Sequence, residues 1–135
     1  MMRPEPAEGG CLCGAVRYRI EGAPRVSLIC HCQSCRKAAG APSVAWVTVA
    51  TAHLEWRRGE PERYRSSAPV VRGFCARCGT PLTWSHERSP EEIDVTTASL
   101  DDPARYPPTR EVWLSERIDW EVANPALTAH PRGSG

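Results

Sequence analysis

Short stretches of alternating apolar and polar residues run through most of this chain. Residues 15–20 put Val16, Tyr18 and Ile20 on one face and two arginines on the other, which is typical of a half-buried strand. Residues 43–50 are rich in β-branched and aromatic side chains and are expected to form a central strand. The same reasoning predicts further strands at 26–29, around Leu54 and Trp56, around Tyr64, at 70–74, around Leu82 and Trp84, and around Ile93 and Val95.

Helical periodicity is almost absent from the sequence. Residues 36–39 predict a single helical turn, which Gly40 and Pro42 end. The chain contains 13 prolines, which disfavour long helices, and turn signals separate the predicted strands. We therefore expect a mainly β protein with one domain at residues 9–123, a flexible tail at 1–8 and a second flexible tail at 124–135.

Size and charge narrow the classes of function. A chain of 135 residues, 41% of them hydrophobic and 24% charged, suits one globular domain with a real core. The net charge of +1 provides no general attraction to nucleic acid or to an anionic membrane, so neither is expected as a partner. The longest apolar stretch, Val44–Ala50, is too short to cross a membrane, and the start lacks the apolar run of a signal peptide. We therefore expect a cytoplasmic protein.

Seven cysteines in three tight groups are the strongest chemical signal. An odd number cannot pair completely within one chain, and the cytoplasm keeps thiols reduced, so metal binding is favoured over disulfides. Thiolates at these short spacings suit a tetrahedral zinc ion. The groups are Cys11-x-Cys13, Cys30-x-Cys32-x-x-Cys35 and Cys75-x-x-Cys78.

The division of these thiols between ions decides their chemistry. The two pairs can together close a structural site of four thiolates, while the middle group can hold a second ion and leave one position open, as catalytic zinc sites do. On an extended segment Cys30 and Cys32 share a face, and Cys35 can curl back toward them. A competing division joins Cys75 and Cys78 to two cysteines of the middle group and leaves the first pair unused. The spacing leaves both divisions open.

The remaining polar and aromatic residues carry weaker signals. His31 stands between two cysteines, but on an extended segment its side chain points away from theirs, so we interpret it as a residue that does not bind the metal. The five tryptophans lie mostly in alternating stretches and are expected in the core. Three further histidines stand alone in the sequence and are interpreted as surface or packed residues: His53, His86 and His130.

Four segments carry a resemblance to a known family. In chain order they are GGCLCGAVRY from Gly9, CHCQSCRK from Cys30, GFCARCGTPL from Gly73 and TASLDDP from Thr97. Over residues 9–120 the chain resembles the glutathione-dependent formaldehyde-activating enzyme family, the group that also contains centromere protein V. The resemblance implies a zinc-binding β-tent fold of the Mss-four-like class with two zinc ions per chain. It implies a structural zinc on Cys11, Cys13, Cys75 and Cys78, and a catalytic zinc on Cys30, Cys32 and Cys35.

The resemblance also implies an activity. It points to a carbon–sulfur lyase of the S-hydroxymethylglutathione synthase type, which condenses a small thiol such as glutathione with formaldehyde or another small aldehyde. Three thiolates weaken zinc as a Lewis acid, so its expected role is to bind and position the substrate thiol. One position departs from the family pattern, because Glu111 stands where the family often has a histidine before Trp113. The alternative is a non-catalytic zinc module of the same fold that binds a protein partner, although such a module has no need of an open metal position.

Overall fold

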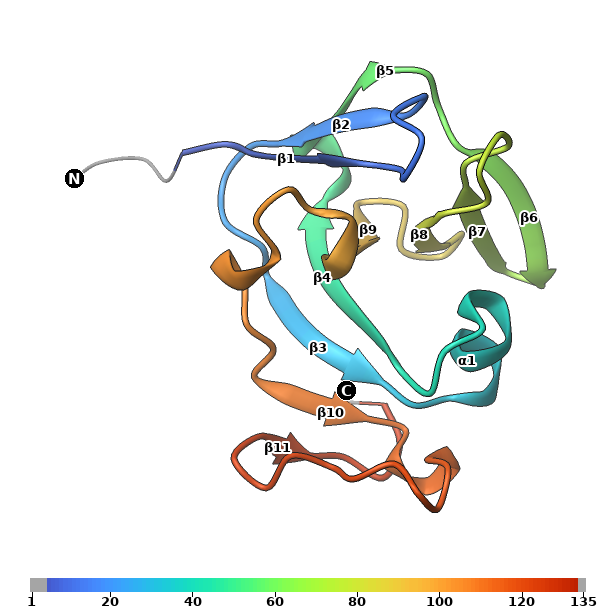
Figure 1. Ribbon diagram of the computed structural model, residues 1–135, viewed down its shortest axis with the longest axis vertical. Coiled ribbons are helices and arrows are strands. Elements are labelled where there is room, and N and C mark those ends of the chain that lie inside the picture. The colour runs from blue at the N-terminus through green and yellow to red at the C-terminus, as the bar shows by residue number, and fades with distance from the viewer. Residues whose placement is uncertain (1–4, 134–135) are drawn as a thin grey trace.

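The structure, a computed structural model, describes residues 5–133 (Figure 1). This part of the chain contains eleven strands, one α-helix and four short 3₁₀ turns. The strands are β1 (Ala7–Gly10), β2 (Arg17–Ile20), β3 (Val26–Cys30), β4 (Val44–Ala50), β5 (Leu54–Arg58), β6 (Glu62–Ser67), β7 (Val70–Phe74), β8 (Pro81–His86), β9 (Glu92–Thr96), β10 (Arg110–Val112) and β11 (Thr128–Ala129). The helical segments are α1 (Gln33–Ala39), η1 (Thr51–His53), η2 (Thr97–Ser99), η3 (Pro103–Arg105) and η4 (Leu114–Glu116).

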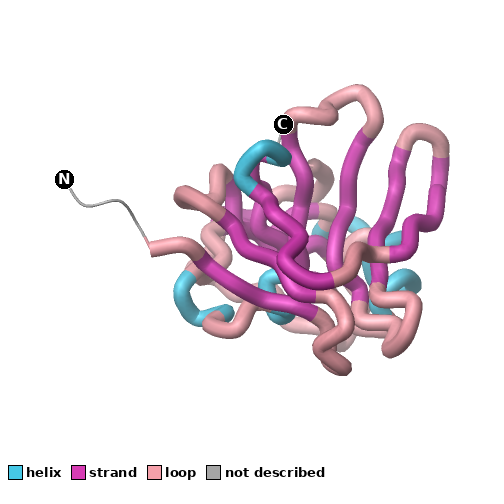
Figure 2. The backbone as a smooth tube through the Cα atoms, turned by 90° about the horizontal axis from the view of Figure 1, so that it is seen from above, coloured by secondary structure: helices cyan, strands magenta, loops and turns pink. Residues whose placement is uncertain are grey.

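The strands form two sheets. Strands β1, β2 and β5 make a small antiparallel sheet, and the other eight make a large sheet in the order β11-β10-β3-β4-β9-β8-β7-β6. In the large sheet β10 runs parallel to both of its neighbours, and the remaining pairs are antiparallel. Seen from above, strands make up far more of the chain than helical segments do, and loops and short helical turns connect them (Figure 2). This confirms the expected mainly β, single-domain architecture.

The main core lies between the two sheets. Tyr18 and Ile20 of the small sheet are fully buried, as the alternation of residues 15–20 predicts. Val47, Val49 and Val95 meet them from β4 and β9 of the large sheet. Strand β4 pairs on both sides, with β3 and with β9, and is the central strand that its composition predicts.

The opposite face of the large sheet carries a different set of side chains. Paired residues on neighbouring strands share a face, and the register places Thr48, Asp94, Trp84 and Arg72 in one row across β4, β9, β8 and β7. Beside this row a second buried cluster forms around Trp46 and two cysteines of the middle group. This face therefore combines polar, aromatic and thiol groups.

The expected boundaries need correction at both ends of the domain. Ala7 and Glu8, expected in the N-terminal tail, belong to β1, and Ala7 is buried against Ile20. Residues 124–133, expected in the C-terminal tail, add β11 to the large sheet and accept backbone hydrogen bonds from Trp113 and the two residues after it. Residues 1–4, 134 and 135 of the expected tails lie outside the described residues.

Two local expectations also need correction. Helix α1 begins at Gln33, three residues before the predicted turn, because the Cys32 side chain accepts a hydrogen bond from the Cys35 N–H and caps the helix. Trp120 is 70% exposed and takes no part in the core. The helix still ends at Gly40, whose φ of 63° is the left-handed conformation of a C-terminal cap.

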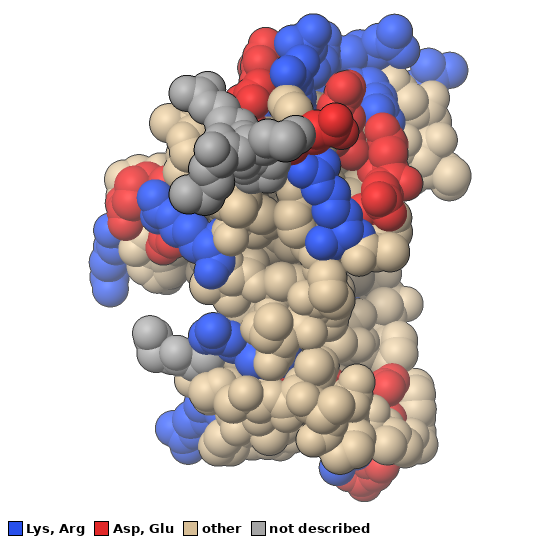
Figure 3. Space-filling model, turned by 90° about the vertical axis from the view of Figure 1, so that its left-hand side faces the viewer, with Lys and Arg blue, Asp and Glu red and all other residues tan. Residues whose placement is uncertain are grey.

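On the side drawn in Figure 3, the surface has no large patch of one charge sign. Acidic and basic side chains are intermixed there on either side of a broad uncharged band. Among residues 5–133, no helix has the length and apolar character needed to cross a membrane.

Candidate functional site

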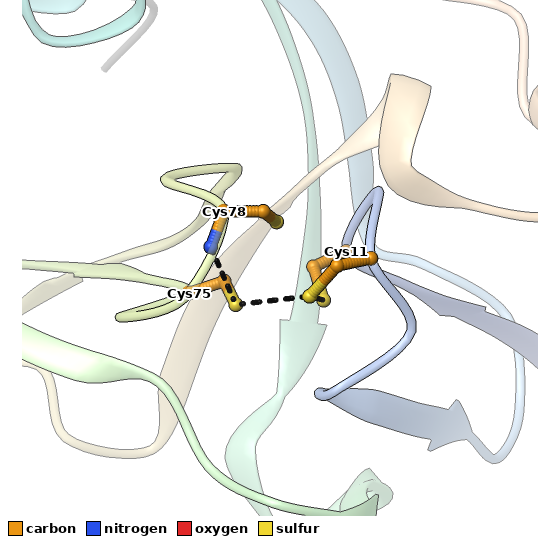
Figure 4. Close-up of side chains that lie close together, drawn as sticks. Cys11, Cys75 and Cys78 are labelled. Carbon is orange, nitrogen blue, oxygen red and sulfur yellow. Dashed lines mark hydrogen bonds between the residues drawn. The ribbon is translucent and has the colours of Figure 1, made fainter.

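The first cysteine cluster joins two loops that are distant in the sequence. Cys11 and Cys13 lie between β1 and β2, whereas Cys75 and Cys78 form the turn between β7 and β8. Figure 4 shows Cys11 facing Cys75 and Cys78. The Sγ atoms of Cys11 and Cys13 are 3.6 Å apart, those of Cys13 and Cys75 are 3.8 Å apart, and all four lie within 4.8 Å of one another. A tetrahedron with zinc–sulfur bonds of about 2.3 Å has edges of about 3.8 Å, so this donor set fits zinc.

Hydrogen bonds stabilise negative charge on these sulfurs. The Val16 N–H donates to Cys11 Sγ at 3.2 Å, and the Cys78 N–H donates to Cys75 Sγ at 3.4 Å. The hydroxyl and backbone of Thr80 lower the pKa of Cys78 to about 5. Burial raises the pKa of Cys11, but the bonds from Val16 and the neighbouring thiols outweigh it, and the pKa is lowered. Thiolates are the form in which cysteine binds metal.

The second cluster lies where β3 ends and α1 begins. Cys30 is the last residue of β3, Cys32 caps the helix, and Cys35 is buried in its first turn. This short strand-to-helix connection brings the three Sγ atoms within 4.8 Å of one another. The structure therefore groups the seven cysteines as four and three, with Cys75 and Cys78 beside the first pair and not beside the middle group.

The three thiols of the second cluster have pKa values shifted in opposite directions. The thiols of Cys30 and Cys35 lower the pKa of Cys32 to about 2, with Arg72 contributing, while the pKa of Cys30 is raised by its bonds to the other two thiols and by burial. The guanidinium of Arg72 lies 3.7 and 3.8 Å from Cys35 Sγ through its two terminal nitrogens. Three thiolates and a divalent ion would carry a net charge of −1, which this arginine offsets.

His31 is turned away from the thiols, as its position on an extended segment predicts. It is fully buried, and its Nε2 lies 2.7 Å from Oε1 of Glu111. The other carboxylate oxygen of Glu111 accepts the Asn124 N–H at 2.7 Å. This buried pair therefore connects the cysteine loop, β10 and the C-terminal segment.

A cavity of about 220 Å³ lies beside the three cysteines. Trp46, Trp84 and Trp113 contribute to its walls, and Asp94 and Arg72 are its charged side chains. A second cavity of about 630 Å³ shares Trp46 and Arg72 with it. The cluster thus faces an apolar space with a few polar groups, which is the usual composition of a small-molecule site.

Comparison with known proteins identifies the family. A family model described as "Glutathione-dependent formaldehyde-activating enzyme" matches residues 6–116. The chain belongs to this family. A Halomonas elongata protein named "Putative glutathione-dependent formaldehyde-activating enzyme" is 32% identical over 124 residues, which cover 84% of this chain and 78% of that protein. A crystal structure of a Rhodobacter sphaeroides protein shares the fold, with a TM-score of 0.59 and 21% identity over 91% of this chain and 98% of that one.

Several residues of the candidate site escaped the sequence analysis. Asp94, Arg72 and Trp84 come together only through the register of β7, β8 and β9, which no local pattern reveals. Glu111 was noted as a departure from the family pattern, and the structure shows what it does here: it binds His31. No local pattern pointed to that contact, because Glu111 follows the charged Arg110 in the sequence.

Proposed function

We propose that this protein is a carbon–sulfur lyase that forms and breaks the adduct of a small thiol, such as glutathione, with formaldehyde or another small aldehyde. Membership in the formaldehyde-activating family and the name of the Halomonas relative support this activity. The observation that carries the proposal is the group of Cys30, Cys32 and Cys35, which gathers three thiols at the wall of a cavity without a fourth ligand among the described residues.

The cysteine geometry suits two zinc ions with different roles. One would be held by Cys11, Cys13, Cys75 and Cys78, and the other by Cys30, Cys32 and Cys35. Cys30, Cys32 and Cys35 would hold the second ion as thiolates, and a zinc ion there would supply a further position for a substrate thiol and lower the pKa of that thiol. Arg72 stabilises the negative charge that gathers at the site, and the tryptophan walls give the reacting atoms apolar surroundings.

The cavities suit a thiol of the size of a short peptide. The smaller one has room for an aldehyde and the thiol end of the substrate, and the larger one has room for the remainder. Lys37 and Arg72 line the larger cavity and provide positive charge for a substrate carboxylate. A reducing compartment such as the cytoplasm would keep the thiols of both protein and substrate free.

A cysteine-to-serine substitution, made once in the three-cysteine cluster and once in the four-cysteine cluster, tests the proposal. Cys32→Ser should leave the circular dichroism spectrum intact, retain one zinc per chain and abolish catalysed adduct exchange, followed by NMR exchange spectroscopy of thiol and formaldehyde. Cys78→Ser is the matched variant and should lose the folded structure, because its cluster ties the first loop to the turn after β7. Full turnover by the Cys32→Ser protein would contradict the proposal and favour a non-catalytic zinc module that binds a partner protein.

A further inference from the structure

Asp94 is a carboxylic acid on the same cavity as the three cysteines. It lies on β9, directly between Thr48 of β4 and Trp84 of β8, on the sheet face that carries Arg72. It contributes to the wall of the 220 Å³ cavity and also to that of an adjoining cavity of about 450 Å³. The carboxyl can therefore meet a substrate on one side and exchange protons with water on the other.

The surroundings of Asp94 keep its charge poorly compensated. The Thr48 hydroxyl donates a hydrogen bond to Oδ1 of Asp94 at 2.7 Å. Within residues 5–133 the carboxyl accepts no other hydrogen bond, so Oδ2 is available to a substrate. Burial raises the pKa of Asp94 to about 6, against the lowering effect of the Thr48 bond and with a further rise from the nearby charge of Glu92. A group that titrates near neutral pH can both accept and donate a proton under physiological conditions.

Other titratable groups near Asp94 come from each element packed around its two cavities. Arg72 lies on β7, His86 on β8 and Glu92 on β9 itself, and the three cysteines lie at the end of β3 and the start of α1. Thr48 on β4 and Trp84 on β8, its direct neighbours, do not titrate. Glu92 is engaged by Arg25 at 3.0 Å. Among the described residues, Asp94 is thus the one carboxyl group that lines the 220 Å³ cavity beside the three cysteines.

Thiol addition to an aldehyde needs two proton transfers. The thiol loses its proton before its sulfur lone pair attacks the carbonyl carbon. The carbon–sulfur bond then forms, the π electrons of the C=O bond move to oxygen, and that oxygen takes up a proton to give the hydroxymethyl thioether. A single group can perform both transfers, and the reaction is redox-neutral.

We propose that Asp94 is the general acid–base of this reaction: its carboxylate takes the proton of the incoming thiol and returns it to the aldehyde oxygen. This inference rests on the proposed function. Reversal of the same two transfers releases thiol and aldehyde from the adduct. The Thr48 hydroxyl holds the carboxyl in place through its hydrogen bond.

The first experiment compares Asp94→Asn with Asp119→Asn, which removes an exposed carboxylate far from the cysteine clusters in the sequence. Asp94→Asn retains the shape of the side chain and an oxygen that accepts from Thr48. We expect kcat to fall at least about 100-fold, since general acid–base catalysis contributes about 10²–10⁴-fold, while zinc content and thiol binding stay unchanged. The Asp119→Asn protein should match the wild type. A kcat for Asp94→Asn within about threefold of the wild type would overturn the proposal.

The second experiment follows pH and compares kcat/KM with a resonance that does not depend on turnover. In the wild type, the 13C carboxyl resonance of Asp94 should titrate with a midpoint near pH 6, and kcat/KM should rise with the same midpoint. Thr48→Val removes the hydrogen bond that lowers the pKa, so both midpoints should move to higher pH, whereas Thr48→Ser keeps the hydroxyl and should leave them in place. A kcat/KM profile that does not follow the Asp94 resonance in these variants would refute the acid–base role. A wild-type protein without catalysed exchange would instead refute the proposed function, whatever the resonance shows.

Discussion

Replacing Asp94 with asparagine should stabilise the folded protein, and the gain should depend on pH. Asp94 has its pKa raised from 3.8 to about 6 by burial, so the folded state holds its proton more tightly than the unfolded state does. Stability therefore falls as the pH rises between these two values, and the full cost is present above the folded pKa. Asparagine has no charge to desolvate and can still accept the Thr48 hydrogen bond.

The size of the effect follows from the pKa shift. About two pKa units correspond to about 3 kcal/mol at full ionisation, and partial exposure of the side chain reduces this to about 1–3 kcal/mol. About half of this loss of stability has already developed at pH 5, because the carboxyl of the unfolded chain ionises first. Between pH 5 and pH 8 the stability advantage of the asparagine variant should therefore grow by about 1 kcal/mol. For a chain of this length that is a change of about 3–4 °C in the Tm difference.

Thermal unfolding of the zinc-loaded proteins at several pH values between 5 and 8 would measure this difference. Titration of the cysteine ligands is common to both proteins and cancels when the variant is compared with the wild type at each pH. Asp119→Asn, in which the lost carboxylate is exposed, should show no pH-dependent difference. A constant difference for Asp94→Asn over the whole range, or one that shrinks as the pH rises, would refute the reasoning about the buried carboxyl.

Three further substitutions test other parts of the structure. Glu111→Ala leaves the buried His31 without its partner and should lower the free energy of unfolding by about 3 kcal/mol in denaturant titrations; a loss below 1 kcal/mol would contradict the anchoring role. Gly9→Ala places a Cβ 2.6 Å from the Ser99 carbonyl oxygen and should lower the free energy of unfolding by about 1–3 kcal/mol in the same assay. An unchanged denaturant midpoint would show that the backbone at Ser99 moves aside without cost. Arg72→Gln should weaken zinc binding at the three-cysteine cluster about tenfold in competition with a chromophoric chelator, and equal affinity would show that the arginine does not offset its charge.

Local patterns in the sequence predict most of the strands, for a physical reason. Residues 15–20 alternate because one face of β2 is buried in the core, and the β-branched residues of β4 reflect pairing on both sides. The length of α1 was underestimated, because a cysteine is an unusual helix cap. Strand β11 has only two residues and is held by β10, so no periodic pattern could reveal it.

The residues of the candidate site also fall into those that the sequence reveals and those that it does not. The three cysteine groups are visible in the sequence because ligands of one ion come in short-range pairs, and the grouping into four and three follows once β1 and the turn after β7 meet. Asp94 and Arg72 could not be found, since each lies in an ordinary strand and reaches the cavity only through pairing across four strands. The pairing of Glu111 with His31 likewise depends on the parallel alignment of β10 with β3.

The most direct test of the account is the number of zinc ions per chain, measured by native mass spectrometry together with alkylation of accessible thiols. The account predicts two ions in the wild type and one in the Cys32→Ser protein, with the cysteines of the middle group protected from alkylation only when the second ion is bound. A wild-type protein that holds a single ion, with Cys30, Cys32 and Cys35 free to react, would contradict it.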